Sequence, residues 1–258
     1  RCKSEWSSPL VIAPKKGPEK WRMCWDGRAI NRIIKADTYT MGNVQDALDR
    51  LQGAKVITTL DLQSGYFQIK VAEEDQTKLA FSIPRQGNVT DTYTWTRMPF
   101  GIQTAPATFQ RAMDRVLGPM GGEHDEGTTG GFVGDIGHFA LAYIDDIIIW
   151  SSSWEEHLLH LEEVLRRLAL FGFKCRPEKC IVGADKVRFL GFIVGVHEGG
   201  VHGIATDPDK LISIKNFPTP RNRPDVKRWL ISEKVLNSNK NFWEKFKPRL
   251  IETELYKI

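Results

Sequence analysis

The sequence predicts an α+β fold in which an antiparallel sheet is backed by helices. Short apolar runs that are rich in β-branched and aromatic residues, such as those within 139–150, predict strands. A segment that begins at Ser153 has leucines at helical spacing and predicts an amphipathic helix. With 258 residues, 41% of them hydrophobic and 26% charged, the chain can bury a sizeable core. These totals are typical of a globular protein with about one to three subdomains.

The first two predicted strands are joined by a basic turn. Residues 10–12 and 21–25 are apolar runs, and the segment between them contains two prolines and a glycine, which favour a turn. Lys15 and Lys16 lie in this turn, and Arg22 follows it. Because lysine and arginine bind phosphate oxygens, this hairpin would suit a triphosphate.

The next segments predict a helix and three further strands. Residues 44–51 read as a short helix, with Asn43 as its N-cap and Gly53 beyond its end. A strand at 58–62 follows, and Asp61 lies where it ends. The alternating segment 65–71 predicts another strand. Residues 78–84 and 92–98 predict a hairpin-like pair.

A helix and a glycine-rich stretch precede the central motif. Thr104 and Pro106 are typical of a helix start, and Gly118 ends the apolar pattern that follows. The stretch 119–138 is rich in glycine and has too little apolar content to pack, so we expect a flexible insertion.

Residues 139–150 read FALAYIDDIIIW, two apolar runs that meet at Asp145 and Asp146. We interpret them as a β-hairpin with both acids at its tip. Neighbouring carboxylates repel each other at neutral pH, so a cation is expected beside them. If the strand that ends at Asp61 pairs beside this hairpin, its carboxylate approaches Asp145. Two such carboxylates can hold two Mg²⁺ ions about 3.5–4 Å apart. A solvated acidic turn is the alternative.

The chain beyond the hairpin predicts one long helix and one strand. Ser153 and Glu156 form a capping box for the helix, and Gly172 closes it. Four leucines are expected to face inward and two histidines to lie on the surface: Leu158, Leu161, Leu165 and Leu168, and His157 and His160. Residues 187–196 predict a strand in which Leu190 and Gly191 suggest a bulge or a close backbone approach, and a further helix is expected to begin at 207.

Charge and cysteine usage indicate the setting of the protein. The four cysteines show neither CxxC pairs nor the density of a secreted disulfide framework. The net charge is +4, and basic residues interleaved with tryptophan and phenylalanine crowd both 15–35 and 227–249, a pattern that suits a nucleic-acid groove. No apolar run approaches the roughly 20 residues of a transmembrane helix, and the first residues do not read as a signal peptide. We therefore expect an intracellular protein, in a cytoplasmic particle or the nucleus, that is neither secreted nor membrane-bound.

The order of the motifs resembles the reverse transcriptase domain of gypsy-type LTR retrotransposons and, more distantly, the retroviral enzymes. The motifs, found between about residues 8 and 230, are SPLVIAPKK, WRMCWDGRAIN, LDLQSGYFQI, MPFGIQTAPATFQ, YIDDIII, RPEKC, FLGFIV and TPRNRPDVKRWL. The resemblance implies a right-hand polymerase fold. Its fingers would comprise 1–35 and 69–104, its palm 36–68 and 105–198, and a partial, divergent thumb or connection 199–258.

The resemblance also implies an activity and its partners. It predicts an RNA-directed DNA polymerase that extends a primer with dNTPs on an RNA or DNA template. Such a domain normally belongs to a larger Pol polyprotein that also carries RNase H and integrase. The divergent sequence after Leu230 leaves open a catalytically dead or truncated relic that only binds nucleic acid. An RNA-dependent RNA polymerase would share the acidic hairpin.

Site residues carry over position by position from the resemblance. It implies that Asp61, Asp145 and Asp146 are catalytic and, together with Leu62, hold two Mg²⁺ ions, with Mn²⁺ as the alternative ion. The implied dNTP-binding residues are Lys15, Lys16, Arg22, Tyr66 and Phe100. Tyr66 would be the gate that clashes with a ribose 2′-OH, which argues against the RNA polymerase. The implied primer and template contacts are Gln110, Tyr143, Leu190 and Gly191, and Lys179 is the implied general acid. Simple packing or solvation is the alternative for Phe100, Gln110, Lys179 and Leu190.

Overall fold

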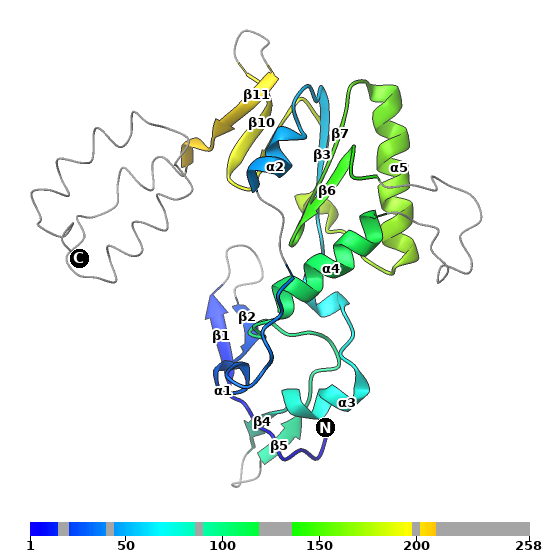
Figure 1. Cartoon of the computed structure of the whole chain (residues 1–258). Coiled ribbons are helices and arrows are strands. Elements are labelled where there is room, and N and C mark those ends of the chain that lie inside the picture. The colour runs from blue at the N-terminus through cyan, green and yellow to red at the C-terminus, as the bar shows by residue number, and fades with distance from the viewer. Residues whose placement is uncertain (15–20, 40–43, 86–89, 119–135, 198–201, 210–258) are drawn as a thin grey trace, which may run out of the picture. The chain divides into compact units, whose positions relative to one another are not determined.

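The computed structural model describes residues 1–14, 21–39, 44–85, 90–118, 136–197 and 202–209 (Figure 1). The described chain divides into two compact units. The first comprises Arg1–Val187 with Gly195–Gly203, and the second comprises Arg188–Val194 with 204–209. Within the described ranges, no helix combines the length and apolar character needed to cross a membrane.

A four-stranded sheet forms the centre of the first unit. Its strands are β6 (Ala140–Tyr143), β7 (Asp146–Ser151), β3 (Val56–Asp61) and β8 (Ile181–Ala184), in the order β6-β7-β3-β8. All neighbouring pairs are antiparallel. In β7 every residue after Asp146 is buried, which explains why this strand is a continuous apolar run and not an alternating one. The predicted acidic hairpin is confirmed as β6 and β7.

The register of β3 against β7 brings the two acidic strand ends together. Asp61, the last residue of β3, is the partner of Asp146, the first residue of β7. The predicted strand at Asp61 and its pairing beside the hairpin are therefore confirmed. The partner of Asp61 in register is Asp146, and Asp145 lies one residue earlier, in the turn.

Two helices, α4 (Ala105–Leu117) and α5 (Trp154–Leu170), cover one face of this sheet (Figure 1). Pro106 lies in the first turn of α4, where its missing N–H costs nothing, and Gly118 is the C-cap, as predicted. At the start of α5, the side chain of Ser153 accepts a hydrogen bond from the backbone N–H of Glu156 (3.3 Å). Phe109 of α4 and Val164 of α5 are fully buried in the core between helices and sheet.

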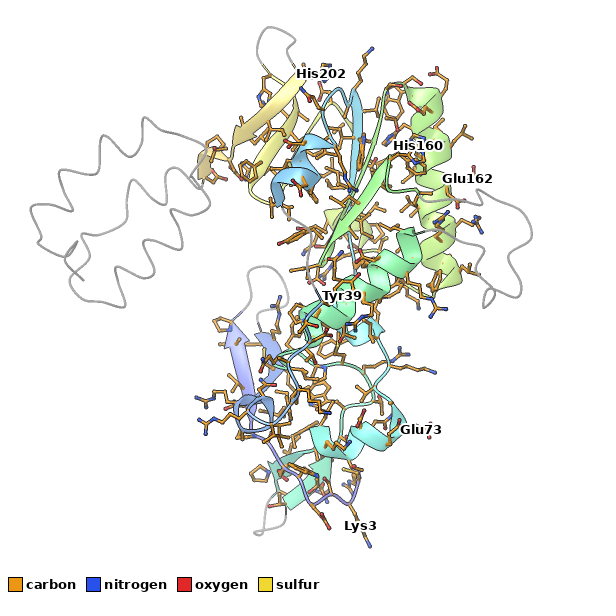
Figure 2. All side chains as sticks on the ribbon, viewed as in Figure 1. Lys3, Tyr39, Glu73, His160, Glu162 and His202 are labelled. Atoms are coloured by element: carbon orange, nitrogen blue, oxygen red, sulfur yellow. The ribbon has the colours of Figure 1, made fainter. Side chains whose placement is uncertain are left out.

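The face of α5 that packs on the sheet is only partly the predicted one, because Leu168 is buried and Leu161 packs against the core as expected. Leu158 and Leu165 were expected to face inward, but their side chains are 59% and 43% exposed. The expectation that the two histidines lie on the surface was also wrong, because both are buried. The buried residues of the helix are His157, His160, Glu163, Val164, Arg167 and Leu168. Figure 2 shows His160 on the side of α5 toward the sheet and Glu162 on the opposite side.

Hydroxyl groups on the sheet explain why His157 and His160 are buried on the side of α5 that faces the sheet. Nε2 of His157 lies 2.7 Å from Oγ1 of Thr58 on β3, and its Nδ1 lies 2.9 Å from Oγ of Ser151 on β7. The Nδ1 of His160 lies 2.8 Å from the same Ser151 Oγ. Buried polar groups are tolerated when they are hydrogen-bonded, so these histidines replace apolar residues on the buried stripe. A pattern of apolar residues alone cannot reveal this arrangement.

The remaining elements are not part of this four-stranded sheet. Strands β1 (Leu10–Pro14) and β2 (Trp21–Trp25) form the predicted first hairpin, and β4 (Phe81–Pro84) pairs with β5 (Thr90–Tyr93). The short helices are α1 (Arg28–Asn31), α2 (Val44–Asp49) and α3 (Glu73–Gln76), with 3₁₀ turns η1 (Gly65–Gln68), η2 (Thr77–Leu79) and η3 (Pro177–Lys179). Strands β9 (Lys186–Phe189), β10 (Phe192–Val196) and β11 (His202–Thr206) form a three-stranded sheet in the order β11-β10-β9.

Two predicted strands have other structures. The alternating segment 65–71 begins with the 3₁₀ turn η1, because Ser64 takes a left-handed conformation (φ 52°) that turns the chain out of a strand. The segment 187–196 is two strands, β9 and β10, separated at Leu190 and Gly191, which both have positive φ (50° and 81°). Residues 15–20, 119–135 and 210–258, which include Lys15, Lys16 and most of the predicted insertion and thumb, lie outside the described residues.

Candidate active site

Three carboxylates meet where β3 ends and the β6–β7 turn begins. Asp61 and Asp146 are paired in register, and Asp145 precedes Asp146 in the turn. Burial raises the pKa of Asp145 above its usual range, and the negative charges of Asp146 and Asp61 raise it further. Loss of hydration and the charge of Asp61 likewise raise the pKa of Asp146. The positive charges of Arg22 and Lys179 at Asp145, and of Lys179 at Asp146, act in the opposite direction but do not cancel the rise in either pKa.

A side chain of α4 holds the turn that presents these acids. Ile144 has φ 54°, a left-handed conformation that is unusual for a β-branched residue and costs roughly 1–3 kcal/mol. The side-chain amide of Gln110 accepts a hydrogen bond from the backbone N–H of Ile144 (2.8 Å) and donates one to the carbonyl of Ala142 (2.9 Å). It also donates to Oδ1 of Asp114 (2.8 Å). Gln110 is only 6% exposed, so its amide braces the turn from the core side.

Gly65 leaves the space that the Asp145 carboxylate occupies. A Cβ at this position would lie 2.6 Å from Oδ1 of Asp145 and 2.9 Å from Cζ of Phe109. Real Cβ atoms do not approach other atoms this closely, so a larger residue would displace the carboxylate or the core. Neither this role of Gly65 nor the bracing role of Gln110 was expected from the sequence. The one sequence signal was a glycine soon after Asp61 in the motif LDLQSGYFQI.

The donor set fits a hard divalent cation. Oδ1 of Asp145 is buried and has no hydrogen-bond partner, although buried carboxylate oxygens are normally paired. Within the described ranges no group of three or more His, Cys, Asp or Glu side chains is arranged to hold a metal ion. Nζ of Lys179 instead lies 2.8 Å from Oδ2 of Asp61 and supplies positive charge there. Carboxylate oxygens and a cation requirement together match Mg²⁺ or Mn²⁺.

A cavity of about 180 Å³ opens beside the carboxylates. Its lining contains the predicted residues Arg22, Asp61, Leu62, Phe100, Asp145 and Lys179, together with Trp21, Met23, Ser64, Gly65, Phe67 and Arg176. The guanidinium of Arg22 lies 4.7 Å from the centroid of the Phe100 ring. The ring of Tyr66 packs 5.1 Å from Phe100 and 5.5 Å from Phe109, and burial raises the pKa of its hydroxyl. Six of the predicted site residues thus line one cavity, whereas Asp146 and Tyr66 are not part of its lining.

The other predicted site residues lie at different places. Tyr143, the last residue of β6, is partly exposed and pairs with Asp146. Leu190 and Gly191 belong to the second unit, where the carbonyl of Gly191 accepts a hydrogen bond from the N–H of Asp207 (3.3 Å).

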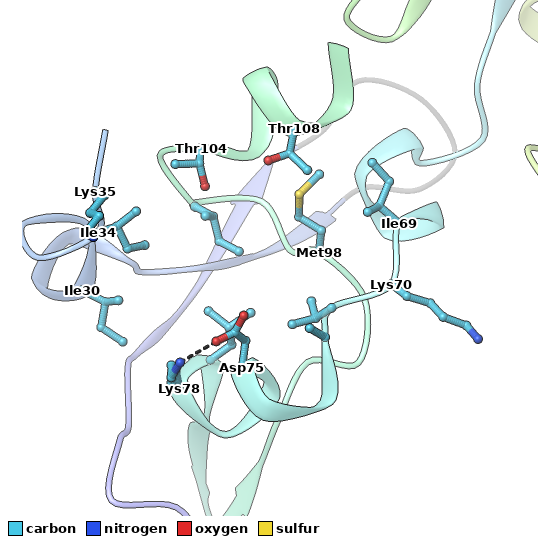
Figure 3. Close-up of a pocket in the computed structure, with 14 residues that line it drawn as sticks. Ile30, Ile34, Lys35, Ile69, Lys70, Asp75, Lys78, Met98, Thr104 and Thr108 are labelled. Carbon is cyan, nitrogen blue, oxygen red and sulfur yellow. Dashed lines mark hydrogen bonds and ion pairs between the residues drawn. The ribbon is translucent and has the colours of Figure 1, made fainter. Parts of the chain in front are cut away.

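A larger cavity, of about 660 Å³, lies in the first unit away from the acids. Figure 3 shows its largely apolar wall, which includes Ile30, Ile69 and Met98, and an ion pair between Asp75 and Lys78. Asp75 is the one acidic residue of this lining, so the cavity lacks the paired carboxylates found at the smaller one. Size alone therefore does not locate the chemistry.

Comparison with known proteins decides the family. A family model described as reverse transcriptase (RNA-dependent DNA polymerase) matches residues 13–194. The chain belongs to the reverse transcriptase family. It is 35% identical over 231 residues to the retrovirus-related Pol polyprotein from transposon 297 of Drosophila melanogaster. This alignment covers 88% of this chain and 20% of that protein. The Tf2-3 polyprotein of Schizosaccharomyces pombe is 30% identical over 241 residues, or 93% of this chain and 16% of that protein. This reverse transcriptase domain therefore spans at most about a fifth of these curated relatives.

Solved structures give the same result for the fold. The foamy viral protease-reverse transcriptase dRH in complex with double-stranded DNA is similar at a TM-score of 0.74 and 26% identity, over 98% of this chain and 40% of that one. Its complex with an RNA/DNA hybrid gives a TM-score of 0.70 at 26% identity, over 98% and 31%. The predicted right-hand polymerase fold and the resemblance to gypsy-type elements are thus confirmed for this reverse transcriptase domain.

Proposed function

We propose that this domain is an RNA-directed DNA polymerase that extends a primer with dNTPs by two-metal phosphoryl transfer. One observation carries the proposal: of three neighbouring carboxylates, Asp61 and Asp145 line a cavity together with cationic and aromatic side chains, and Asp145 has a buried unpartnered oxygen. Membership of the reverse transcriptase family supports this reading of the site. The intracellular location expected from the sequence stays a prediction.

In this proposal Asp61, Asp145 and Asp146, with Leu62, hold two Mg²⁺ ions, and Mn²⁺ is the alternative ion. Such ions, when bound, stabilise charge on the attacking and leaving oxygens of an in-line displacement. The protein supplies the placement of the acids. The β3–β7 register aligns Asp61 with Asp146, and the Gln110 amide fixes the turn at Asp145. Catalysis of this kind depends on positioning and electrostatics, because phosphoryl transfer leaves little covalent chemistry to the protein.

The cavity residues have distinct roles toward the nucleotide. Arg22 binds phosphate oxygens, and Lys15 and Lys16 of the β1–β2 loop are proposed to do the same. Phe100 and Tyr66 contact the sugar, with Tyr66 excluding a ribose 2′-OH. The ammonium group of Lys179, now against Asp61, donates a proton to the leaving pyrophosphate.

The proposed partners follow from the relatives. The similar foamy viral structures are complexes with double-stranded DNA and with an RNA/DNA hybrid. We accordingly assign a primer–template to this chain, with Tyr143, Leu190 and Gly191 as proposed contacts. Gln110 is buried and is proposed to act through the turn that it braces. The matched transposon proteins are Pol polyproteins, so this domain is proposed to work within such a polyprotein, beside RNase H and integrase.

Primer extension on an RNA template with dNTPs and Mg²⁺ tests the proposal. Asp61→Asn and Asp145→Asn should each lower the extension rate by at least about a thousandfold, because each removes a charge that the reaction requires. Asp75→Asn is the matched control, since Asp75 lies at the other cavity, and it should extend normally. All variants should melt cooperatively.

Three outcomes would contradict parts of the proposal. Normal extension by Asp145→Asn would remove the metal-ligand assignment. If the unsubstituted chain binds primer–template yet never extends it, the chain is the non-catalytic relic. Equal use of rNTPs and dNTPs would refute the gate role of Tyr66 and favour an RNA polymerase.

A further inference from the structure

Three cationic side chains line the cavity beside the carboxylates: Arg22, Arg176 and Lys179. Arg22 lies on β2, Lys179 ends η3, and Arg176 is the N-cap residue of η3. The proposed function uses Arg22 as a phosphate ligand and Lys179 as a proton donor. It gives no role to Arg176, although this residue shares the same space of about 180 Å³.

The backbone of Arg176 is fixed to the end of the catalytic strand. Its N–H donates a hydrogen bond to the carbonyl of Asp61 (2.8 Å). Its own carbonyl accepts from the N–H of Lys179 (3.0 Å) and from Sγ of Cys180 (3.2 Å). These bonds involve main-chain atoms of Arg176, so the residue stays in place when its side chain is replaced.

One partner of the Arg176 guanidinium is a carboxylate that a phosphate can displace. The Nε of Arg176 lies 3.8 Å from Oε2 of Glu178, a long ion pair in which the Arg176 side chain is 25% exposed and the Glu178 side chain 78% exposed. A long ion pair with one exposed partner contributes little to stability. A guanidinium binds phosphate with two parallel charge-assisted hydrogen bonds, which are shorter and stronger. A polyphosphate in the cavity would therefore outcompete Glu178 for Arg176.

We propose that Arg176 binds the terminal phosphates of the incoming dNTP, the part that leaves as pyrophosphate. This inference rests on the proposed function, because it requires that the cavity takes a dNTP. The terminal phosphates carry most of the negative charge of the nucleotide. They must also leave next to Lys179, the proposed proton donor, which lies three residues from Arg176 at the other end of the same short turn.

Steady-state kinetics on an RNA template test this role. Arg176→Gln should raise the KM for dTTP about tenfold, the value of one charge-assisted hydrogen bond to a partly exposed group, with a smaller change in kcat. Arg176→Lys keeps the charge and should recover part of the affinity. The primer–template Kd, measured by fluorescence anisotropy, should change less than about twofold. An unchanged KM for dTTP would overturn the proposal. If primer–template binding also weakened, Arg176 would instead contact nucleic-acid phosphates.

Glu178→Gln is the matched control, because it breaks the same ion pair from the other side. It should leave kcat unchanged and leave the KM for dTTP unchanged or lower. A rise in KM as large as that of Arg176→Gln would show that the ion pair itself supports the site, and the phosphate-binding role would be wrong.

A binding measurement separates this inference from the proposed activity. Inorganic triphosphate, titrated calorimetrically into the full chain without added metal, should bind about tenfold more weakly to Arg176→Gln than to the unsubstituted chain. This readout needs no turnover, so it tests Arg176 even if the chain never extends a primer. Equal binding by the two proteins, or no binding to the unsubstituted chain, would overturn the proposal. Melting curves check that each variant is folded, and Arg176→Lys replaces Arg176→Gln if the latter is not.

Discussion

Replacing Gln110 by methionine isolates the hydrogen bonds that brace the acidic turn. Methionine has nearly the same volume, so no cavity is created, but the N–H of Ile144 and the carbonyl of Ala142 lose their partner. Each buried polar group left unpaired costs about 1–3 kcal/mol. Ala142 is only 4% exposed, whereas Ile144 is partly exposed, so the sum should be about 2–4 kcal/mol. For a chain of this size that corresponds to a fall in Tm of about 5–15 °C.

The same substitution should also slow catalysis. A turn that is no longer braced lets Asp145 move, and a displacement near 1 Å can cost about a hundredfold in rate. Thermal melting and primer extension measure the two effects. Gln103→Met is the control, because the Gln103 side chain is exposed on the loop before α4, and its Tm should change by less than about 2 °C.

Primer–template binding by Gln110→Met distinguishes the bracing role from a direct nucleic-acid contact. The side chain is buried and its amide faces the turn, so Gln110→Met should leave the primer–template Kd unchanged. If Tm and kcat keep their original values while primer–template binding weakens, the bracing role is wrong. Gln110 would then act as the direct nucleic-acid contact that the family resemblance implies.

Two further predictions concern Gly65 and His157. In Gly65→Ala the new Cβ would lie 2.6 Å from Asp145 Oδ1, about 0.8 Å inside ordinary contact, so kcat should fall about a hundredfold. Gly53→Ala, where nothing lies within 4 Å of the new Cβ, should keep its kcat, and an active Gly65→Ala enzyme would contradict the steric argument. Burial lowers the pKa of His157 in the folded protein. As pH falls below about 6.5, His157 is therefore protonated in the unfolded chain before it is protonated in the folded one. The free energy of unfolding decreases as a result. The drop in Tm between about pH 7.5 and about pH 5.5 should be larger for the unsubstituted chain than for His157→Gln. Equal drops would show that His157 does not take up a proton on unfolding.

The parts of the fold that depend on local pattern could be predicted from the sequence. The hairpin at 139–150 and the helix that begins after Thr104 have apolar runs, caps and turn residues that specify them within a few positions. The proximity of Asp61 to the hairpin could be predicted as well, because a β-branched strand ending in an acid has few places to pair. The site roles of Arg22, Phe100 and Lys179 came from the resemblance, and the structure places all three around one cavity.

The parts that depend on distant neighbours could not be predicted. The segment after Ser64 alternates like a strand, yet it begins with a 3₁₀ turn that places Gly65 close to Asp145 and Phe109, an approach that no local pattern records. The four leucines of α5 gave a stripe of the right period, but only Leu161 and Leu168 lie toward the core. The hydroxyl partners of His157 lie 99 and 6 residues away in sequence, and no helical pattern records them.

The histidine and hydroxyl contacts beneath α5 have a consequence for how the sheet is aligned. Apolar packing alone does not fix the alignment of a helix on a sheet, because several alignments bury a similar apolar area and differ little in free energy. A chain of donors and acceptors running from His160 through Ser151 and His157 to Thr58 admits only one alignment of helix and strands. Thr58 lies three residues before Asp61, and Ser151 five after Asp146. Both acid-bearing strands are therefore hydrogen-bonded to the same helix, at Thr58 within β3 and at Ser151, the last residue of β7. These contacts fix the alignment of the two strands, on which the spacing of the carboxylates depends.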